Sequence, residues 1–402
     1  MNTRIIIKIG VLLLFVLSVL NVKAQITTGQ VTGQINTITT AVPFLLIAPD
    51  ARAGSMGDAG VSTSADHSSM HWNPAKIVFA NRDMGVGVSY SPWLRALVPD
   101  INLSYLSGYK KLDDKQAIGM SLLYFSLGDI TFTDVLGTPT GQFRPNEFAI
   151  DLAYSRKLSD NFSSGIAFRY INSNLTGGMN AGSQATHPGN AYAADVSFYY
   201  QKKVGEKDDI FAAGLNISNI GTKISYTEST EKDFIPINLR IGPSYTLNID
   251  TYNKLTFTVD INKLLVPTPP MYYADSVDNS GKPVIQSGKK DNVPLVSGMF
   301  GSFSDAPGGF KEEMKEINYS VGAEYWYDKQ FAIRAGYFFE DPTKGNRQYI
   351  TFGAGLKYNV FGLDFAYLVP ASSDVKSPLE NTLRFTLYFD FEAFKEQNKQ
   401  KP

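Results

Sequence analysis

Residues 146–157 read NEFAIDLAYSRK, and their apolar side chains alternate with small or charged ones. Phe148, Ile150, Leu152 and Tyr154 fall at every second position, which places them on one face of an extended strand. Such a strand shows its two faces to two different environments. The segment is followed by a short polar turn, Arg156 to Asn161, and then by another alternating run.

The same alternation continues from Met84 almost to the end of the chain. We count about fourteen such strands, each near the length that a tilted strand needs to cross a bilayer. The clearest further cases are Ile101, Leu103 and Tyr105; Ile118, Met120, Leu122 and Tyr124; Leu255, Phe257, Val259 and Ile261; Ile350, Phe352, Ala354, Leu356 and Tyr358; and Leu383, Phe385, Leu387 and Phe389.

Alternation alone would also fit a soluble β-sandwich, so the lengths of the connections decide. Every second connection is a short polar turn, and the connections between them are generally longer, which gathers the long loops at one end of the strands. Bacterial outer-membrane barrels have this asymmetry, with short periplasmic turns and long outer loops. The short connections are 110–116, 156–161, 202–208, 248–253, 327–330 and 359–362, and the long ones are 127–146, 172–190, 220–236, 262–316, 340–348 and 369–380.

The sequence therefore predicts an all-β fold, an antiparallel transmembrane β-barrel of about 14 strands over residues 81–391. We expect a long extracellular loop at about 262–316 and a charged periplasmic tail at 392–402. An even strand number places both termini in the periplasm of a protein integral to the cell outer membrane, in contact with its lipids. Aromatic residues near strand ends are candidates for the interfacial girdles: Tyr90, Trp93, Tyr105, Tyr109, Tyr154, Tyr170, Tyr199, Tyr200, Tyr325, Trp326, Tyr327, Phe338, Tyr358 and Tyr367.

The first residues predict export. Arg4 and Lys8 precede an apolar run from Ile9 to Leu20, and small residues around Ala24 mark a cleavage site. We interpret residues 1–24 as a signal peptide. A membrane anchor is the weaker interpretation, because the run is short for roughly 30 Å of hydrocarbon.

Composition excludes several classes of function. The chain of 402 residues has a formal net charge of -1 and no cysteine, which removes disulfide frameworks and thiolate chemistry. No cluster of Lys and Arg marks a nucleic-acid partner. We expect no cofactor. His187 is expected to be solvated, and the charged runs Lys202 to Asp209 and Lys311 to Glu316 are interpreted as solvated turns or a short exposed helix.

Residues 25–80, the hatch segment, lack sustained alternation and are rich in small residues between Ala48 and Ala80. Glycines 54, 57 and 60 have the wrong spacing for a dinucleotide fingerprint, and they instead allow close backbone approach. Asp66, His67 and His71 lack evident further metal ligands, so we expect polar packing and no metal. The chain contains no G-x-S-x-G nucleophile motif.

The hatch segment resembles the N-terminal pattern of the FadL-like superfamily of outer-membrane barrels, in which this segment folds into the lumen. The narrower resemblance is to the PorV (LptO) family of the type IX secretion system. It is carried by the apolar run Val42 to Ile47 before Ala48 to Arg52, and by His71-Trp72 before Asn73-Pro74-Ala75. The hatch motif residues are Asp50, Arg52, Gly54, Met56, Gly57, Gly60, Asn73 and Pro74.

The resemblance implies a barrel without enzymatic activity. PorV-like proteins bind the C-terminal signal domains of exported cargo at a giant barrel translocon and deliver them to a cell-surface attachment complex. FadL-like relatives instead transport long-chain fatty acids or other hydrophobic compounds, and the shared motif leaves both functions open. One family name also implies lipid deacylation, although nothing in the chain identifies a nucleophile.

The loops are unusually apolar for exposed connections, which predicts a surface for a protein partner. Packing of the loops on one another and a gate for a small ligand are the alternatives. The candidate residues are Trp93, Leu94 and Leu97 in the first loop, and Met271, Tyr272, Tyr273, Met299, Phe300 and Phe303 in the longest.

Overall fold

The computed structural model describes residues 35–95, 98, 100–133, 136–179, 185–228, 232–279, 281–359, 361–371 and 379–391. The predicted signal peptide, residues 25–34 and the predicted tail at 392–402 lie outside this part of the chain. The barrel and everything packed within it belong to one compact unit that begins at Asn36. In the described ranges, no helix combines the length and the apolar character needed to cross a membrane.

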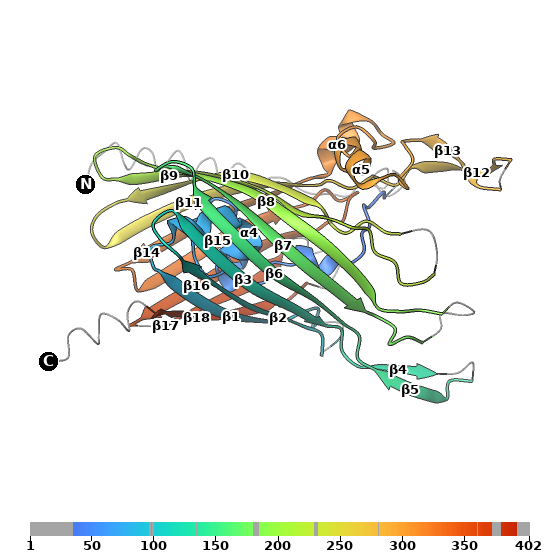
Figure 1. The fold of residues 1–402 in the computed structure, drawn as a ribbon, viewed down its shortest axis with the longest axis horizontal. Coiled ribbons are helices and arrows are strands. Elements are labelled where there is room, and N and C mark those ends of the chain that lie inside the picture. Colours follow the sequence, from blue (N-terminus) through green and yellow to red (C-terminus); the bar gives the residue numbers. More distant parts are fainter. Residues whose placement is uncertain are drawn as a thin grey trace. The chain divides into compact units, whose positions relative to one another are not determined.

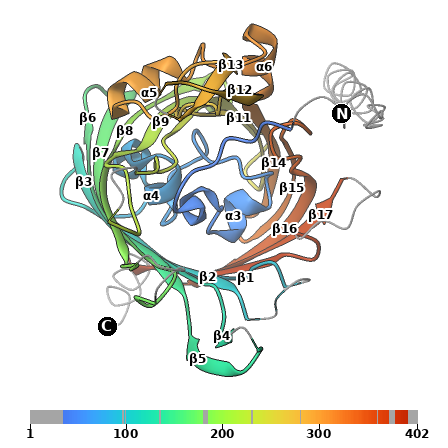
Figure 2. The same cartoon turned by 90° about the vertical axis from the view of Figure 1, so that its right-hand side faces the viewer.

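Fourteen antiparallel strands close into one barrel, because β1 pairs with β18 as well as with β2 (Figures 1 and 2). The predicted fold class is therefore confirmed. The strands of the barrel are β1 (Met84–Pro92), β2 (Asn102–Lys111), β3 (Gln116–Ser126), β6 (Asn146–Lys157), β7 (Phe162–Asn174), β8 (Gly189–Val204), β9 (Asp209–Gly221), β10 (Asn238–Asn248), β11 (Asn253–Leu264), β14 (Ile317–Tyr327), β15 (Phe331–Phe339), β16 (Gln348–Tyr358), β17 (Phe361–Pro370) and β18 (Leu383–Asp390).

The predicted difference between short and long connections is also confirmed. β6 and β7 are joined by a turn between Lys157 and Phe162, whereas the chain between β11 and β14 runs from Leu264 to Ile317. We call the end with the short connections the turn end and the opposite end the loop end. The loop end carries two hairpins and two helices: β4 (Ile130–Thr133) with β5 (Pro139–Phe143), β12 (Met271–Val277) with β13 (Pro283–Ser287), α5 (Leu295–Gly301) and α6 (Phe310–Lys315).

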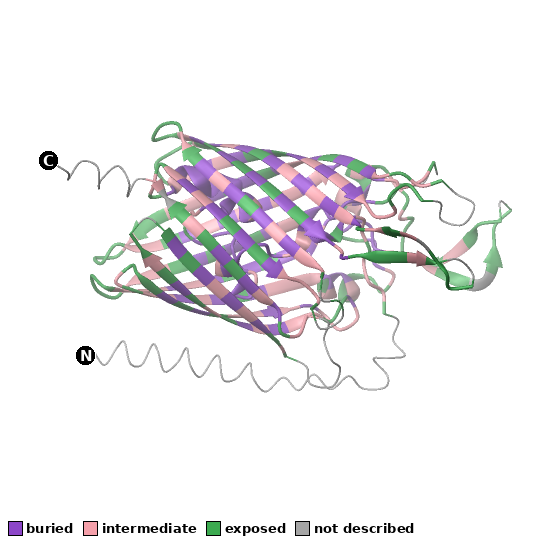
Figure 3. Cartoon of the chain, turned by 90° about the horizontal axis from the view of Figure 1, so that it is seen from below, coloured by how far each residue is buried: buried purple, intermediate pink, exposed green. Residues whose placement is uncertain are grey.

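Outward and inward side chains alternate along the wall (Figure 3). On β3, Ile118 and Met120 face outward and are exposed, whereas Ala117 and Leu123 are buried inside. An apolar outer face is favourable in hydrocarbon, and closure satisfies the backbone groups that lipid cannot bond. The wall thus has the composition of a membrane barrel.

One alternating set faces the opposite way from the others. Leu103 and Tyr105 point inward and are 1% and 2% exposed. Four of the aromatic residues that we predicted for the interfacial girdles are instead buried inside the barrel, so the prediction is wrong for these four. Period two reveals that a strand has two faces but not which one is outside, and the inner face becomes apolar wherever the lumen holds a packed segment. The four buried residues are Tyr105, Tyr109, Tyr199 and Phe338.

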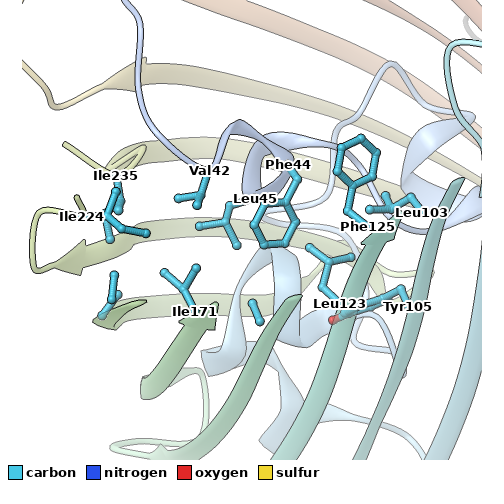
Figure 4. Packing of buried hydrophobic residues seen from close by; sticks show 13 residues of the cluster. Val42, Phe44, Leu45, Leu103, Tyr105, Leu123, Phe125, Ile171, Ile224 and Ile235 are labelled. Carbon is cyan, nitrogen blue, oxygen red and sulfur yellow. The ribbon is translucent and has the colours of Figure 1, made fainter. Parts of the chain in front are cut away.

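From Val42 onward the hatch segment lies inside the barrel (Figure 2), whereas Asn36 lies at the loop end and bonds to Pro269 and Glu312. Near the loop end, Val42, Phe44 and Leu45 pack with Leu103 and Phe125 of the wall in an apolar cluster (Figure 4). Burial of each such large side chain contributes about 1.5–3 kcal/mol. In its described part, the helical turns of the segment are η1 (Pro43–Leu46), α3 (Ala51–Gly54), α4 (Ser69–Trp72) and η2 (Pro74–Phe79).

Candidate functional site: the hatch and the loop end

Asp50 and Trp72 fasten two turns of the hatch segment to each other. Asp50 caps α3 by accepting a hydrogen bond from Ala53 N at 2.9 Å, and it accepts a second from Trp72 Nε1 at 2.6 Å. Gly60 lies under the Trp72 ring, where an added methyl carbon would be 2.5 Å from the ring. The indole leaves room at this position for glycine alone.

Arg52 joins the hatch segment to the barrel wall. Its guanidinium forms two hydrogen bonds with Glu324 of β14, at 2.8 and 2.9 Å, and one with Asp66 at 2.8 Å. Glu324 also accepts from Arg334 Nε at 2.7 Å, and Arg334 Nη1 donates to Asp364 at 2.7 Å. Buried charges persist in proteins when they are paired and hydrogen-bonded in this way.

Glycines allow the backbone of the hatch segment to touch the wall. Gly57 has a left-handed φ of 68°, and its N–H donates to Thr351 Oγ1 at 2.8 Å. A methyl carbon on Gly57 would lie 2.5 Å from the carbonyl oxygen of Tyr337. Met56 approaches the wall as closely, at Gly336. Gly54 gives comparable room to the Arg384 side chain.

Asn73 and Pro74 anchor the last turn of the hatch segment. The Asn73 amide nitrogen donates to the carbonyl oxygens of Val61 and Phe198, both at 3.0 Å. The amide oxygen accepts from Ala75 N and so caps η2, with Pro74 as the first helical residue. Since Phe198 belongs to β8 and Glu324 to β14, the segment is fixed to well-separated parts of the wall.

The two histidines of the hatch segment pack against aromatic rings. His67 stacks on Tyr388 with ring centroids 5.0 Å apart, and His71 meets the edge of Trp72 at 4.8 Å. Among the described residues, no group of three His, Cys, Asp or Glu side chains is arranged to hold a metal ion. His187 is exposed, as expected.

A cavity between the hatch segment and the wall has a volume of about 50 Å³ and is lined by Leu46, Asp58, Trp72, Arg240 and Tyr349, among others. Roughly one or two water molecules would fill it. The described contacts of the hatch motif residues thus join turns of the segment to one another and to the wall of the barrel.

At the loop end, α6 is clamped to the rim of the barrel by ion pairs. Lys263 follows Val259 and Ile261 on the outward face of β11, yet it is 7% exposed. Its ammonium lies 3.1 Å from Glu313 and 2.7 Å from Glu316, and Lys344 contacts Glu316 at 3.0 Å. The expectation of a solvated run at Lys311 to Glu316 is therefore wrong for Glu313 and Glu316, although a short helix does form there.

Asp305 lies beside this clamp. One carboxylate oxygen accepts from Thr268 N at 3.3 Å. Burial, and then the negative charges of Glu313 and Glu316, raise the pKa of Asp305 to about 6 against the effect of the Thr268 hydrogen bond, which lowers it. This carboxyl group therefore titrates near neutral pH.

The predicted partner residues differ in exposure. Tyr272, Tyr273, Phe300 and Phe303 are 44%, 49%, 67% and 50% exposed. The half-buried ones are Trp93, Leu94, Met271 and Met299, of which Trp93 packs against the apolar cluster around Phe44 and Met299 against one around Phe234. Leu97 lies outside the described residues.

Sequence reasoning missed two further exposed apolar residues, Phe310 and Met314 of α6, which are 78% and 45% exposed. Both lie within or next to the charged run Lys311 to Glu316, so no apolar pattern in the sequence identifies them. Together with Phe300 and Phe303 they form a group that we call the aromatic rim. It lies on the long loop that Figure 1 shows beyond the strands of β10 and β11.

A larger cavity opens among the loops near the start of the described hatch segment, with a volume of about 630 Å³. We call it the mouth cavity. Phe125, Leu127 and Phe234 form apolar parts of its lining, and Glu147 lies on it as a 3% exposed carboxylate. Ligand pockets commonly have volumes of this size.

The model of the family "Type IX secretion system protein PorV" matches residues 30–271. The chain belongs to this family. It is accordingly a component of the type IX secretion system, and a barrel of the outer membrane.

No curated protein matches the PorV-family chain significantly. Among solved structures, the toluene transporter TodX of P. putida aligns at 12% identity with a TM-score of 0.48, over 84% of this chain and 95% of TodX. The toluene transporter TbuX of Ralstonia pickettii aligns at 11% identity with a TM-score of 0.46, over 85% of this chain and 97% of TbuX. A Pseudomonas aeruginosa FadL homologue aligns at 11% identity with a TM-score of 0.45, over 89% and 99% of the two chains.

Proposed function

We propose that this outer-membrane barrel is a non-enzymatic shuttle of the type IX secretion system. In this proposal its loop end is extracellular and both termini are periplasmic. It binds the C-terminal signal domain of exported cargo at the giant barrel translocon, and it delivers the cargo to the cell-surface attachment complex.

The observation that carries the proposal is the aromatic rim held on a fixed mount. Phe300 and Phe310 expose more than half of their surface, although α6 is clamped by Lys263 and Lys344. Exposed apolar groups of this kind mark sites for protein partners, where aromatic and Met side chains supply much of the binding energy. Because these ion pairs restrain α6 before a partner binds, less conformational entropy is lost when a partner covers the rim.

The packed lumen supports a carrier that acts at its surface. Inside the barrel the hatch segment contacts β8 through Asn73 and β14 through Arg52, and it therefore obstructs passage of a cargo protein through the lumen. A shuttle needs no conducting path, since its cargo is bound at the loop end.

Capture from native envelopes tests the proposal. The unaltered protein should recover proteins that share a C-terminal signal domain, together with the translocon. The double variant Phe300→Ser/Phe303→Ser should reduce this recovery at least about tenfold, because hot-spot aromatics contribute about 2 kcal/mol or more each. Tyr252→Ser is the matched control, since Tyr252 is an equally exposed aromatic residue in a tight turn at the opposite end.

Equal recovery by the double variant and the control would remove the aromatic rim from the proposal. Recovery of neither signal-domain proteins nor translocon by the unaltered protein would overturn the shuttle function itself.

A second candidate function is transport of hydrophobic compounds. The apolar lining of the mouth cavity favours it. This function also requires the hatch segment to open, because ion pairs and close backbone contacts fix it in the lumen. Uptake of a long-chain fatty acid into vesicles that contain the protein, at a rate above that of empty vesicles, would support it.

A further inference from the structure

Glu147 is the most deeply buried of the charged residues that line the mouth cavity. It lies on the inner face of β6 and is 3% exposed. Its carboxylate accepts a hydrogen bond from Ser173 Oγ at 2.6 Å, and Ser173 Oγ accepts one in turn from the Tyr226 hydroxyl at 2.9 Å. These partners are neutral, and among the described residues no cationic side chain forms an ion pair with Glu147.

The neighbouring inward carboxylate has a different environment. Asp151 lies four residues further along the same face of β6, and it pairs with the guanidinium of Arg169 at 2.6 Å. A buried carboxylate without a positive partner is unfavourable by several kcal/mol relative to water. Asp151 thus has a cationic partner within the protein, whereas Glu147 has none among the described residues.

Neither lysine of the cavity lining forms an ion pair with Glu147. Lys223 lies over the Phe234 ring, with its ammonium 4.1 Å from the ring centroid, and donates to Asn292 at 3.4 Å. Partial burial lowers the pKa of Lys223, while the charges of Asp233 and Asp291 raise it. The lining as a whole carries three carboxylates, Glu147, Asp233 and Asp291, against two lysines, Lys223 and Lys232, so it has an excess of negative charge.

The apolar lining suits the stem of a long cationic side chain. Val42 and Phe125 belong to the packed cluster in Figure 4 and also line the cavity, as do Leu127 and Val266. Lysine and arginine bury their methylene groups along such surfaces while the charged group bonds to a polar partner. A carboxylate beside apolar walls is therefore complementary to a cation carried on an aliphatic stem.

We infer that the mouth cavity binds a lysine or arginine side chain of an extended polypeptide segment, with Glu147 as the acceptor for its charged group. This inference rests on the proposed function, because it takes the ligand to be part of exported protein cargo. The cavity of about 630 Å³ exceeds what one side chain needs, and so leaves space for the residues that flank it.

Two synthetic peptides test the inference on the full-length protein in lipid nanodiscs. The probe is acetyl-Val-Lys-Val-amide, and its reference is the norleucine analogue, which keeps the apolar stem and lacks the charge. Calorimetric titration of the unaltered protein should show at least about tenfold tighter binding of the lysine peptide, the effect of one hydrogen-bonded charge pair.

Glu147→Gln should abolish this preference and leave the affinity for the norleucine peptide unchanged. Glutamine retains an oxygen that can accept from Ser173, so the local structure is preserved. Glu206→Gln is the control, because it removes the same charge from an exposed short turn between β8 and β9. Heat-modifiable migration in gels verifies that each variant is a folded barrel.

Equal affinity for the two peptides in the unaltered protein would overturn the inference, and so would a preference that survives Glu147→Gln. Hexylamine distinguishes a polypeptide from a small amphiphile as the source of the cation. If hexylamine binds as tightly as the lysine peptide, the cavity takes a small amine and the polypeptide assignment is wrong.

Failure of this inference can be told from failure of the proposed function. Loss of signal-domain capture in Phe300→Ser/Phe303→Ser, with no lysine preference in the unaltered protein, would overturn the cavity site and support the shuttle. Absence of all signal-domain capture, with a lysine preference that Glu147→Gln abolishes, would support the cation site and overturn the shuttle.

Discussion

The hatch segment and the long loop between β11 and β14 are both irregular, and both are fastened by buried ion pairs. Arg52 ties the hatch segment to Glu324 of the wall, and Glu316 ties the loop to Lys263 and Lys344. The two regions differ in how far their large apolar side chains are exposed. The hatch segment buries Phe44, Met56 and Trp72 to within 2% of complete burial, whereas the loop exposes Phe300, Phe303 and Phe310.

Buried ion pairs therefore have two different effects in this protein. In the hatch segment they stabilise a packed structure, and in the long loop they hold a segment whose aromatic side chains stay exposed. In the hatch segment, ion pairs and close packing act together, and Arg52, Gly57 and Asn73 all contact the barrel wall. In the long loop, ion pairs hold the backbone while apolar packing is left incomplete. A partner can complete that packing.

The largest expected effect comes from Arg52→Ala. This change leaves Glu324 and Asp66 without one of their cations inside the plug, and breaking a buried pair lowers stability by about 3–5 kcal/mol. Urea unfolding of the protein in vesicles measures the loss, and planar-bilayer conductance should rise as the hatch segment loosens.

Arg144→Ala is the control for this variant. Arg144 pairs with Asp129 at 2.7 Å, but both side chains are about 60% exposed, so no measurable loss is expected. Equal losses in the two variants would show that burial does not distinguish the hatch ion pairs from surface pairs.

Lys344→Met should release the long loop without loosening the plug. Glu316 keeps only Lys263 as a cationic partner, and the opening of the loop should become more frequent by a factor of roughly ten to a hundred. Hydrogen exchange followed by mass spectrometry should show faster exchange over residues 295–316 and unchanged exchange over residues 50–76. Faster exchange in both regions would mean that the hatch and the loop are coupled.

Gly60→Ala and Gly301→Ala compare packing in the two regions. A methyl group on Gly60 meets the Trp72 ring, whereas one on Gly301 in α5 has no atom within 4 Å. Overpacking should lower the free energy of unfolding by about 1–3 kcal/mol in the first variant. The second should be neutral or up to about 1 kcal/mol more stable, because alanine favours helix. A penalty of similar size in both would contradict the open packing of the loop.

The smallest effect concerns pH and the long loop. Because the pKa of folded Asp305 is raised to about 6, above its unfolded value of 3.8, the native loop binds this proton more tightly than the unfolded chain does. The contribution of Asp305 to loop stability should therefore grow as the pH falls from 7 toward 4. Exchange over residues 264–317 should slow accordingly, and Asp305→Asn should remove that component. An identical pH response in Asp305→Asn would rule out this carboxyl group as its source.

The strands could be predicted from the sequence because lipid and lumen impose a two-residue period on them. Ile118 to Tyr124 shows the period, and the lengths of the connections distinguish a barrel from a sandwich. The direction of Leu103 and Tyr105 could not be predicted in the same way. It depends on Phe44 and Leu45, which reach the inner wall from a segment without periodicity.

The clamp at the loop end lay beyond sequence reasoning. Lys263 and Glu316 are 53 residues apart, and Glu316 ends a charged run that has the composition of a solvated turn. Only the folding of α6 back onto the rim brings these groups together. The hatch motif, in contrast, was visible as a pattern, while the contacts of Arg52 and Asn73 required the structure.

The position of Lys263 makes one side of the barrel different from the rest. Around most of its circumference the wall offers hydrocarbon-like side chains to every neighbour alike. At β11, however, α6 covers Lys263 on the outer face of the wall. Because α6 carries Phe310 and Met314, the position of Lys263 on β11 sets the side of the barrel on which this part of the aromatic rim lies.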